Sequence, residues 1–436
     1  MKLVVDIQKL GHRGMGIARY GGKVILVPLT APGDRVEVKI TCSHRDYDEA
    51  ELIRVINSSP LRREPPCPYF GHCGGCQLQH LHFHYQERLK EELFREMLIH
   101  QGEVDESRIE GILSPSNEFE YRSHIDLHIR WSGKPLLGFM TWRGKRIVPI
   151  DRCLLALPKI QNFLIETRKM LEKIKAVRVK KVTISGDNPG DNVTLVLWSS
   201  KALSRKACKL LKEMTAEIPF LRGIYILNRR GKSPITLEEG KNSPSGVVYS
   251  VPAFREITLE VWPGVFSQVN PEANRSLISE VMNWAKQGKT ERVLDLYAGM
   301  GNFTVPMSFQ AQEIIAVDIN PLAIENNKLN GLRYNRNNIQ WLTLPAKAAL
   351  RSFIESGEYF DLVIMDPPRS GVKGVLNEIL RLKPERIIYV SCDMATLARD
   401  IRFFQKSGSY QVITAKPLDM FPQTFHLESI TLLQKV

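Results

Sequence analysis

The sequence predicts an α/β protein with three parts: a doubly wound C-terminal domain, a small N-terminal β-barrel, and a central α+β region that carries a cysteine cluster. Three observations lead to this fold class. Apolar strand-like runs alternate with helical segments over residues 266–436, and short β-like runs broken by glycine turns fill residues 1–57. Residues 58–265 mix strands, an amphipathic helix and closely spaced cysteines.

The first 57 residues read as a set of short strands. The clearest are Val24–Val27 and Val36–Ile40, and Ala50–Val55 closes the set. Pro32-Gly33-Asp34 is a turn signal between two of them. Such spacing predicts a small closed barrel of the oligonucleotide-binding type.

The central region, residues 58–265, carries a helix from about Tyr85 to Gln101 and most of the cysteines. Three cysteines fall within ten residues and are separated by glycines that allow a tight wrap, and a fourth follows later: Cys67, Cys73, Cys76 and Cys153. Four thiolates at such spacing suit either a tetrahedral zinc ion or an iron–sulfur cluster. Composition does not decide between the two, because several histidines lie nearby.

The C-terminal region, residues 266–436, has the texture of buried parallel strands with helices between them. The helical segment Pro321–Asn330 is one example. A ligand is expected at the carboxyl ends of such strands. The predicted strands are Arg292–Tyr297, Glu313–Asp318, Ile339–Thr343, Phe360–Asp366 and Arg386–Ser391.

A glycine turn follows the first of these strands, in the run Asp295-Leu-Tyr-Ala-Gly-Met-Gly-Asn302. Glycines let a backbone approach a ligand closely, and Asp318 ends the next strand, where an acid can accept hydrogen bonds from a ribose diol. A dinucleotide site would want a third glycine at position 304, which is threonine. The run resembles the first motif of class I (Rossmann-like) methyltransferases, which favours S-adenosylmethionine.

Three further segments follow predicted strands and should meet at one edge of the sheet: Asp366-Pro-Pro-Arg369, Ser391-Cys392-Asp393 and Phe425-His-Leu-Glu428. Methylation of uracil at C5 needs a thiolate that adds to C6 and a base that removes the C5 proton. Cys392 and Glu428 supply these two groups. A lone cysteine at a strand end is usually a small buried hydrophobe, so the argument depends on the combined set.

These segments, together with Phe266-Ser-Gln-Val-Asn270, resemble the RNA 5-methyluridine (uracil-5-) methyltransferases, a family that includes 23S ribosomal RNA and transfer RNA enzymes. Gly14–Arg19, Val24–Pro28 and Pro32–Val36 resemble the RNA-binding TRAM domain. The resemblance implies Cys392 as nucleophile and Glu428 as base. It implies cofactor contacts at Gln268, Tyr297, Gly299, Asn302, Asp318 and Asp366. Residues 343–347 depart from the family pattern, so no adenine contact is assigned there.

The resemblance also implies a 4Fe-4S cluster on Cys67, Cys73, Cys76 and Cys153, with a structural or RNA-positioning role. The net charge of +13 fits an RNA partner. We expect 23S rRNA as the substrate, with position 54 of tRNA as the alternative. An RNA cytosine-5 methyltransferase and a non-catalytic RNA-binding iron–sulfur protein are further alternatives. Without a signal peptide or an apolar run long enough to cross a bilayer, we expect a cytoplasmic monomer.

Overall fold

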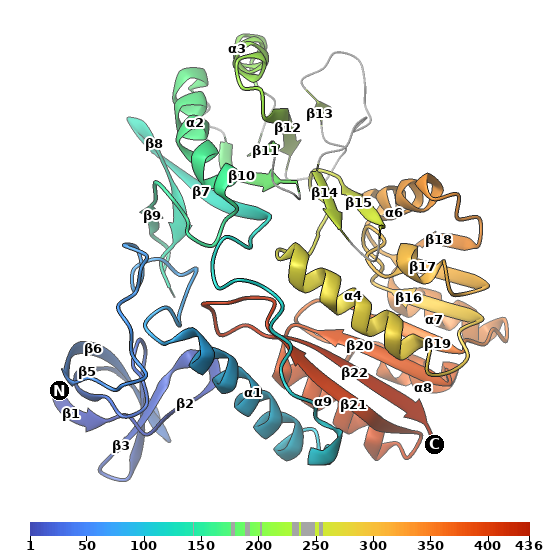
Figure 1. The fold of residues 1–436 in the computed structure, drawn as a ribbon, viewed down its shortest axis with the longest axis horizontal. Coiled ribbons are helices and arrows are strands. Elements are labelled where there is room, and N and C mark those ends of the chain that lie inside the picture. The colour runs from blue at the N-terminus through green and yellow to red at the C-terminus, as the bar shows by residue number, and fades with distance from the viewer. Residues whose placement is uncertain are drawn as a thin grey trace.

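The computed structural model describes residues 1–142, 144–175, 179–187, 192–200, 203–228, 235–236, 249–252 and 256–436. Three sheets dominate it (Figure 1). A six-stranded sheet lies at the N-terminus, a seven-stranded sheet occupies the central region, and a second seven-stranded sheet forms the C-terminal, catalytic domain.

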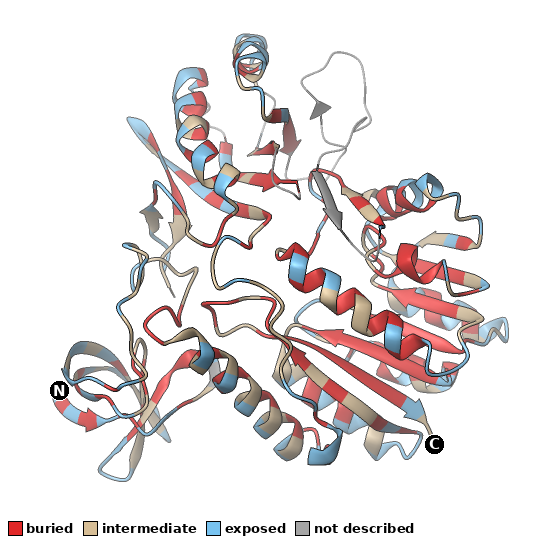
Figure 2. Cartoon of the chain, in the orientation of Figure 1, coloured by how far each residue is buried: buried red, intermediate tan, exposed pale blue. Residues whose placement is uncertain are grey.

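The catalytic sheet has the order β18-β17-β16-β19-β20-β22-β21. The first five of these strands run parallel, and β22 and then β21 complete the sheet by antiparallel pairing. Figure 2 shows the central strands buried along most of their length, as apolar runs between two helical layers require. The strands are β16 (Arg292–Leu296), β17 (Glu313–Asp318), β18 (Ile339–Thr343), β19 (Leu362–Met365), β20 (Arg386–Ser391), β21 (Tyr410–Leu418) and β22 (Glu428–Lys435).

All five predicted parallel strands are therefore present, with β16 and β19 slightly shorter than expected. The chain passes from β18 on one side of β16 to β19 on the other. This reversal is the topological switch point at which open α/β sheets bind ligands. The helices of this domain are α4 (Pro271–Ala285), α5 (Thr304–Met307), α6 (Pro321–Arg333), α7 (Ala346–Glu355), α8 (Leu376–Leu382) and α9 (Met394–Lys406).

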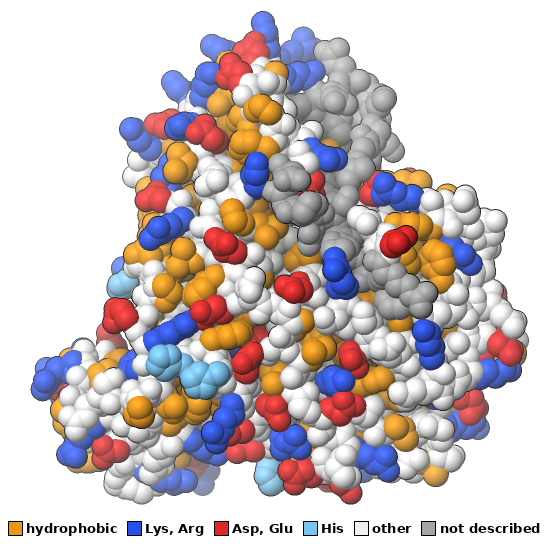
Figure 3. All heavy atoms as spheres, viewed as in Figure 1, with side chains coloured by type: hydrophobic (Ala, Val, Ile, Leu, Met, Phe, Trp, Pro, Cys, Tyr) orange, Lys and Arg blue, Asp and Glu red, His pale blue; other side chains and the backbone are white. Residues whose placement is uncertain are grey.

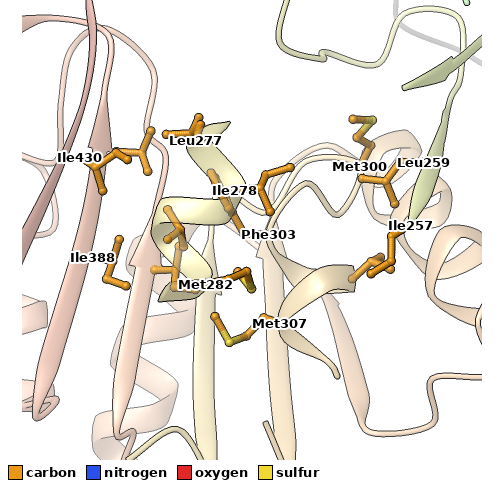
Figure 4. Packing of buried hydrophobic residues seen from close by; sticks show 14 of the residues in the cluster. Ile257, Leu259, Leu277, Ile278, Met282, Met300, Phe303, Met307, Ile388 and Ile430 are labelled. Carbon is orange, nitrogen blue, oxygen red and sulfur yellow. The ribbon is translucent and has the colours of Figure 1, made fainter. Parts of the chain in front are cut away.

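Each face of the catalytic sheet has its own apolar core. On one face, α4 packs its buried residues Leu277, Ile278 and Met282 against Phe303 and Ile388 (Figure 4). Truncating one such buried leucine to alanine costs about 2–5 kcal/mol, so this layer holds α4, and the segment that leads into it, firmly on the sheet. The other face packs against α7, α8 and α9.

Helix α1 (Phe83–His100) agrees closely with the predicted helix and also covers this second face. Its buried residues Phe94 and Leu98 belong to the same apolar cluster as α9 and β21. After α1 and the short helix η2 (Glu106–Arg108), the chain runs beside β21, where Ile109 and Leu113 form parallel bridges with Ala415 and Leu418. The segment that follows the loop of Cys67, Cys73 and Cys76 (residues 67–76, the cysteine loop) is thus packed on the catalytic domain.

The N-terminal sheet has the order β1-β5-β6-β4-β3-β2 around its own small core. The β4–β6 pair is parallel and the others are antiparallel. In β1, buried and exposed residues alternate, as expected for a strand with one face on a core. The elements are β1 (Lys2–Asp6), β2 (Lys9–Leu10), η1 (His12–Gly14), β3 (Gly16–Tyr20), β4 (Lys23–Val27), β5 (Arg35–Ser43) and β6 (Tyr47–Asn57).

The central sheet has the order β13-β12-β11-β10-β7-β8-β9, and α2 (Pro158–Ile174) and α3 (Arg205–Ala216) cover one of its faces. A short ribbon of β14 (Tyr249–Pro252) and β15 (Thr258–Val261) leads to the catalytic domain. The sheet strands are β7 (His124–Ser132), β8 (Lys134–Met140), β9 (Ile147–Pro149), β10 (Val179–Gly186), β11 (Val193–Ser199), β12 (Leu221–Asn228) and β13 (Ile235–Thr236). Among the described residues, no helix combines the length and apolar character that crossing a bilayer requires.

Candidate active site

Cys392 and Glu428 lie opposite each other at the carboxyl edge of the catalytic sheet. β20 ends at Ser391, β22 begins at Glu428, and Ser391 pairs with Ser429 in the antiparallel register of these strands. Cys392, one residue beyond Ser391, is therefore set beside Glu428, one residue before Ser429. The Ser429 hydroxyl donates to the Ser391 carbonyl oxygen at 2.9 Å and supports this register.

Asp366 reaches the same edge from the neighbouring strand. β19 ends at Met365 and runs parallel to β20, so the residue after β19 emerges near Cys392. Gln268 arrives from the segment before α4, and its side-chain amide donates to the Asp366 carboxylate at 3.3 Å. The fold thus brings together four of the residues that the sequence singles out, from four separate segments of the chain.

Burial raises the pKa values of the acidic side chains at this edge of the sheet. It raises the pKa of the Cys392 thiol to about 12, and the nearby carboxylates of Glu428 and Asp366 add to the effect, whereas Arg369 opposes it. Burial also raises the pKa of Asp366 to about 7. The pKa of Glu428 lies well above its ordinary value because the residue is buried and faces the charge of Asp366.

Glu428 is only 1% exposed, and its Oε1 atom accepts no hydrogen bond from the described part of the chain. An ionised carboxylate without such partners is costly to bury. A carboxyl group in this setting holds a proton more tightly than one in water, and is correspondingly the better base when ionised.

The pocket over Cys392 gathers residues from all three parts of the chain. Its volume is about 320 Å³, and it is lined by Arg13, Gly74, Gln77, Trp142, Arg369, Cys392, Asp393, Met394, Phe425, His426 and Leu427. Arg13 belongs to the N-terminal sheet domain, and Gln77 and Trp142 belong to the central region. Sequence reasoning did not select these three residues. The one feature of the sequence that could have pointed to Arg13 is the glycine that follows it, which predicts a turn. In the structure Arg13 itself has a φ of 62°.

The loop between β21 and β22, which carries His426 into this pocket, is joined to the cysteine loop through Gln423. Gln423 is fully buried with a φ of 69°, and its carbonyl oxygen accepts from the backbone N–H groups of Gln77 and Leu78 at 3.1 and 3.0 Å. Its side-chain oxygen accepts from Gln86 of α1 at 3.0 Å. Burial lowers the pKa of His426 to about 4, so its imidazole is neutral at pH 7.

The glycine turn after β16 forms a cradle. Gly299 and Gly301 both have positive φ, and a Cβ on Gly301 would lie 2.8 Å from the side-chain oxygen of Asn327. The Gly299 N–H donates to one oxygen of Asp318 at 3.0 Å, and the Asn320 N–H donates to the other at 2.8 Å. Asp318 therefore ties this turn to the end of β17, and each of its oxygens has a further lone pair for a ribose hydroxyl.

Tyr297 and Asn302 flank this turn. Tyr297 is half-buried with a φ of 63°, and Asn302 exchanges two hydrogen bonds with Asn274 of α4, at 2.8 and 2.9 Å. Beneath them, the Thr304 hydroxyl donates to the buried Asp295 carboxylate at 2.5 Å. Asn302 thus helps to hold the turn against α4, a structural contact that the motif alone does not predict.

The four candidate metal ligands line a single pocket: Cys67, Cys73, Cys76 and Cys153. Mainly apolar side chains, together with Gln79, Arg122 and Arg152, form the rest of its wall. The Arg122 Nε atom lacks a hydrogen-bond partner among the described residues. Within the described ranges, no three Cys, His, Asp or Glu side chains converge closely enough to hold a single metal ion. Burial raises the pKa of Cys73 to about 11 and of Cys76 to about 12.

Basic side chains also gather on the surface. Figure 3 shows Lys and Arg at the top of the molecule, over α3 and its surroundings. Helix α3 contributes Arg205, Lys206, Lys209 and Lys212. A surface of this kind attracts the phosphates of a nucleic acid in a salt-dependent way.

The doubly wound sheet and its glycine turn define a class I S-adenosylmethionine-dependent methyltransferase. Two family patterns then narrow the class. The tRNA (Uracil-5-)-methyltransferase pattern matches residues 116–436, and the TRAM domain of tRNA (uracil(54)-C(5))-methyltransferase matches residues 3–61. The chain belongs to this family of RNA uracil-5-methyltransferases.

Similar proteins match along nearly the full chain. An uncharacterized RNA methyltransferase of Aquifex aeolicus is 33% identical, covering 99% of this chain and 98% of its own. The 23S rRNA (uracil(1939)-C(5))-methyltransferase RlmD of Alkalilimnicola ehrlichii is 32% identical, with coverages of 99% and 96%. The crystal structure of Pyrococcus abyssi tRNA (uracil-54, C5)-methyltransferase with S-adenosyl-L-homocysteine has a TM-score of 0.73 at 24% identity, covering 98% of this chain and 99% of that one, and so shares the fold.

Proposed function

We propose that this enzyme transfers the methyl group of S-adenosylmethionine to C5 of a uridine in 23S rRNA through a covalent bond between Cys392 and C6. The observation that carries the proposal is the β20–β22 register, which sets Cys392, a lining residue of the pocket described above, beside the buried Glu428. The RlmD relatives supply the rRNA assignment, because they match this chain from end to end at 30–32% identity.

The reaction follows from these groups. The Cys392 sulfur adds to C6 of the uracil, and the electron pair displaced from the C5–C6 bond makes C5 nucleophilic. C5 takes the methyl group from the sulfonium donor, which departs as the neutral thioether. Glu428 then removes the C5 proton, the double bond re-forms, and the Cys392 thiolate leaves. A target in structured RNA has to leave its stack to enter the pocket.

We assign the cofactor to the glycine cradle. Gly299 has open space beside it for the donor, Asp318 would accept from its ribose, and Tyr297 and Asn302 flank the turn. Gln268 and Asp366 lie between this cradle and Cys392, so we assign them to the junction of donor and uracil. With its pKa raised to about 7, Asp366 can act there as a hydrogen-bond donor as well as an acceptor.

For the cysteine pocket we propose a 4Fe-4S cluster held by Cys67, Cys73, Cys76 and Cys153. A single zinc ion draws its sulfurs to about 2.3 Å from one point. Each cysteine of a 4Fe-4S cluster would bind a different iron atom, and the support for this assignment is that all four thiols line one pocket. Methyl transfer requires no electron, so the cluster would hold the loop that lines the catalytic pocket. Iron and sulfide analysis of anaerobically purified protein tests this, and stoichiometric zinc without iron would contradict it.

We further propose a division of labour among the three parts. Residues 1–57 bind RNA, residues 58–265 carry the cluster and position the substrate, and residues 266–436 perform the transfer. Arg13, Gln77 and Trp142 support this assignment, because each of the first two parts reaches the catalytic pocket. The monomeric state and cytoplasmic location stay predictions.

Covalent trapping tests the mechanism. RNA that carries 5-fluorouridine cannot lose the C5 substituent as a proton, so the enzyme with S-adenosylmethionine should form a stable adduct that Cys392→Ala cannot form. Cys208→Ala, which alters a half-buried thiol of α3, is the matched control and should form the adduct normally. Adducts with 5-fluorocytidine instead would support a cytosine-5 enzyme.

Mapping tests the substrate. Mass spectrometry of ribosomal and transfer RNA from a deletion strain should reveal one 5-methyluridine missing from 23S rRNA. Loss from position 54 of tRNA instead would replace the rRNA assignment with the tRNA alternative, and leave the chemistry at Cys392 unchanged.

A further inference from the structure

A second pocket, of about 230 Å³, lies between the central sheet and the segment that leads into the catalytic domain. Its floor is built from β7, β10 and β11, and residues 262–267 form its other wall. The lining residues are His124, Asp126, Lys181, Thr183, Ser185, Val196, Trp198, Trp262, Pro263, Gly264, Val265, Phe266 and Ser267. None of the roles assigned above uses it.

The strand registers make this floor one continuous patch. Lys181 pairs with Trp198 across β10 and β11, and Thr183 pairs with Asp126 across β10 and β7. His124 pairs with Ser185 in the same way. Because side chains alternate along a strand, these residues share one face of the sheet, while the residues between them pack against α2 and α3 on the other.

A hydrogen-bond chain fixes the aromatic wall of the pocket in place. The Trp198 indole N–H donates to the Thr183 hydroxyl at 2.9 Å, and that hydroxyl donates to Asp126 at 2.5 Å. Asp126 also pairs with the Lys181 ammonium at 2.8 Å, and this ammonium lies 4.7 Å from the centre of the Trp198 ring. These contacts fix the orientation of the indole, and the Lys181 ammonium covers one face of the ring, so a base would stack on the other face.

The charge of the pocket excludes a phosphate as its main occupant. Lys181 is neutralised by Asp126, and burial lowers the pKa of His124 to about 4, so this imidazole is uncharged at pH 7. Uncharged aromatic walls suit the face of a nucleobase, on which any base can stack. The volume is below the roughly 300–1,000 Å³ of pockets that hold drug-sized ligands, and it fits one base better than a whole cofactor.

The pocket is joined directly to the catalytic edge. Phe266, which is 72% exposed, and Ser267 line the pocket, and the next residue is Gln268, whose amide contacts Asp366. The Ser123 N–H donates to the Val269 carbonyl oxygen at 2.8 Å and so fixes this segment to the start of β7. A nucleotide held here would lie beside the segment that carries Gln268 to the catalytic edge.

We propose that this pocket binds the base of an unpaired nucleotide that flanks the target uridine, with Trp198 as its stacking platform. It is thus a second base-binding subsite that contributes to the choice of substrate. The inference rests on the proposed function for its ligand, an RNA fragment that carries the mapped uridine.

The first measurement compares affinities for that fragment. Loss of a base–aromatic stack should raise the Kd of Trp198→Ala for the RNA by about 5- to 150-fold. Trp198→Phe should recover most of the affinity, because it keeps a ring. Thr183→Val, which removes the hydrogen bond that orients the indole, should fall between them. Lys180→Ala is the matched control, since Lys180 is an exposed residue of β10 that does not line the pocket.

The second measurement locates the base. A series of fragments, each with one abasic nucleotide beside the target, is bound to the wild type and to Trp198→Ala. At one position the abasic change should weaken binding to the wild type but add nothing in Trp198→Ala, because both changes remove the same contact. A 2-aminopurine at that position should be quenched on binding to the wild type and not to the variant. This fluorescence readout would not respond to a merely structural role of Trp198.

Three results would overturn the inference: an unchanged RNA affinity of Trp198→Ala, equal penalties at every abasic position, or a change confined to the Kd of S-adenosylmethionine. Failure of the proposed function would look different, because the wild type itself would then leave the fragment unmethylated. If Trp198→Ala fails to fold, Trp198→Phe, Thr183→Val and the wild-type quenching still decide the question.

Discussion

Removing one partner of the ion pair between Lys90 of α1 and Asp419, just after β21, should be among the most destabilising single changes where α1 meets the catalytic domain. The Lys90 ammonium lies 2.7 Å from the Asp419 carboxylate and 3.0 Å from the Phe421 carbonyl oxygen. The two side chains are 2% and 0% exposed. The second Asp419 oxygen, Oδ2, has no hydrogen-bond partner among the described residues, so Lys90 carries most of its compensation.

Replacing Lys90 by methionine keeps the apolar stem and removes the charge. The Asp419 carboxylate would keep the hydrogen bond that its Oδ1 atom accepts from the Phe421 N–H at 3.0 Å, but it would lose its countercharge. Breaking a buried pair in this way costs about 3–5 kcal/mol. Arg88→Ala is the control on the same helix: Arg88 pairs with Glu92 at a similar 2.7 Å, but with exposures of 74% and 50%. Such an exposed pair contributes only about 0.3–0.5 kcal/mol. The expected ratio is therefore roughly tenfold for two pairs of equal length.

Urea denaturation gives the free energy of unfolding, and hydrogen exchange of α1 and β21 amides shows whether this interface opens. The double variant Lys90→Met/Asp419→Asn should recover much of the loss, because it removes both charges. If Lys90→Met lowers the free energy of unfolding by no more than Arg88→Ala does, then burial does not determine the cost of breaking an ion pair, and the prediction is wrong.

Three further outcomes are expected. Glu428→Gln should accumulate a covalent RNA adduct on ordinary uridine, seen as a slow band in denaturing gels, because the C5 proton has no acceptor; free turnover would remove Glu428 from that step. Since burial raises the pKa of Cys392 to about 12, adduct formation with 5-fluorouridine RNA should rise about tenfold per pH unit between about pH 7 and 9, and a flat rate profile would contradict this. Gly301→Ala should weaken S-adenosylmethionine binding in calorimetry, because its φ of 96° strains any side chain by about 1–3 kcal/mol and the added Cβ would crowd Asn327. Gly374→Ala, with open space around its Cβ, should bind normally, and equal losses in both variants would reject the cradle.

The catalytic sheet was largely predictable because its signals are local. A parallel strand buried on both faces is a continuous apolar run, and each of the five runs proposed from the sequence is a strand in the structure. The two C-terminal strands, β21 and β22, were not predicted. β21 is the edge strand of the sheet, with β22 between it and the other strands. An edge strand can contain polar residues and proline, and β21 includes Lys416 and Pro417, so it does not form a continuous apolar run. The two segments are strands because they pair with each other and with β20, and the local sequence does not show this pairing.

The full lining of the pocket around Cys392 could not be predicted from the sequence. Motifs placed Cys392 and Asp366 near one edge because the carboxyl ends of parallel strands converge there. For Glu428 the predicted reason was wrong, since Glu428 begins the antiparallel strand β22 instead of following a strand, and it reaches this edge through the pairing of β22 with β20. Arg13 and Trp142 also line this pocket, and they come from other parts of the chain. The cysteine loop meets the loop of His426 through Gln423, whose partners Gln77 and Gln86 lie more than 300 positions away in the chain. No pattern within a window of residues encodes such a contact. A change in the cysteine loop should therefore alter the catalytic pocket even though Cys67, Cys73 and Cys76 do not line it, since Gln77 both lines the pocket and donates its N–H to the Gln423 carbonyl oxygen.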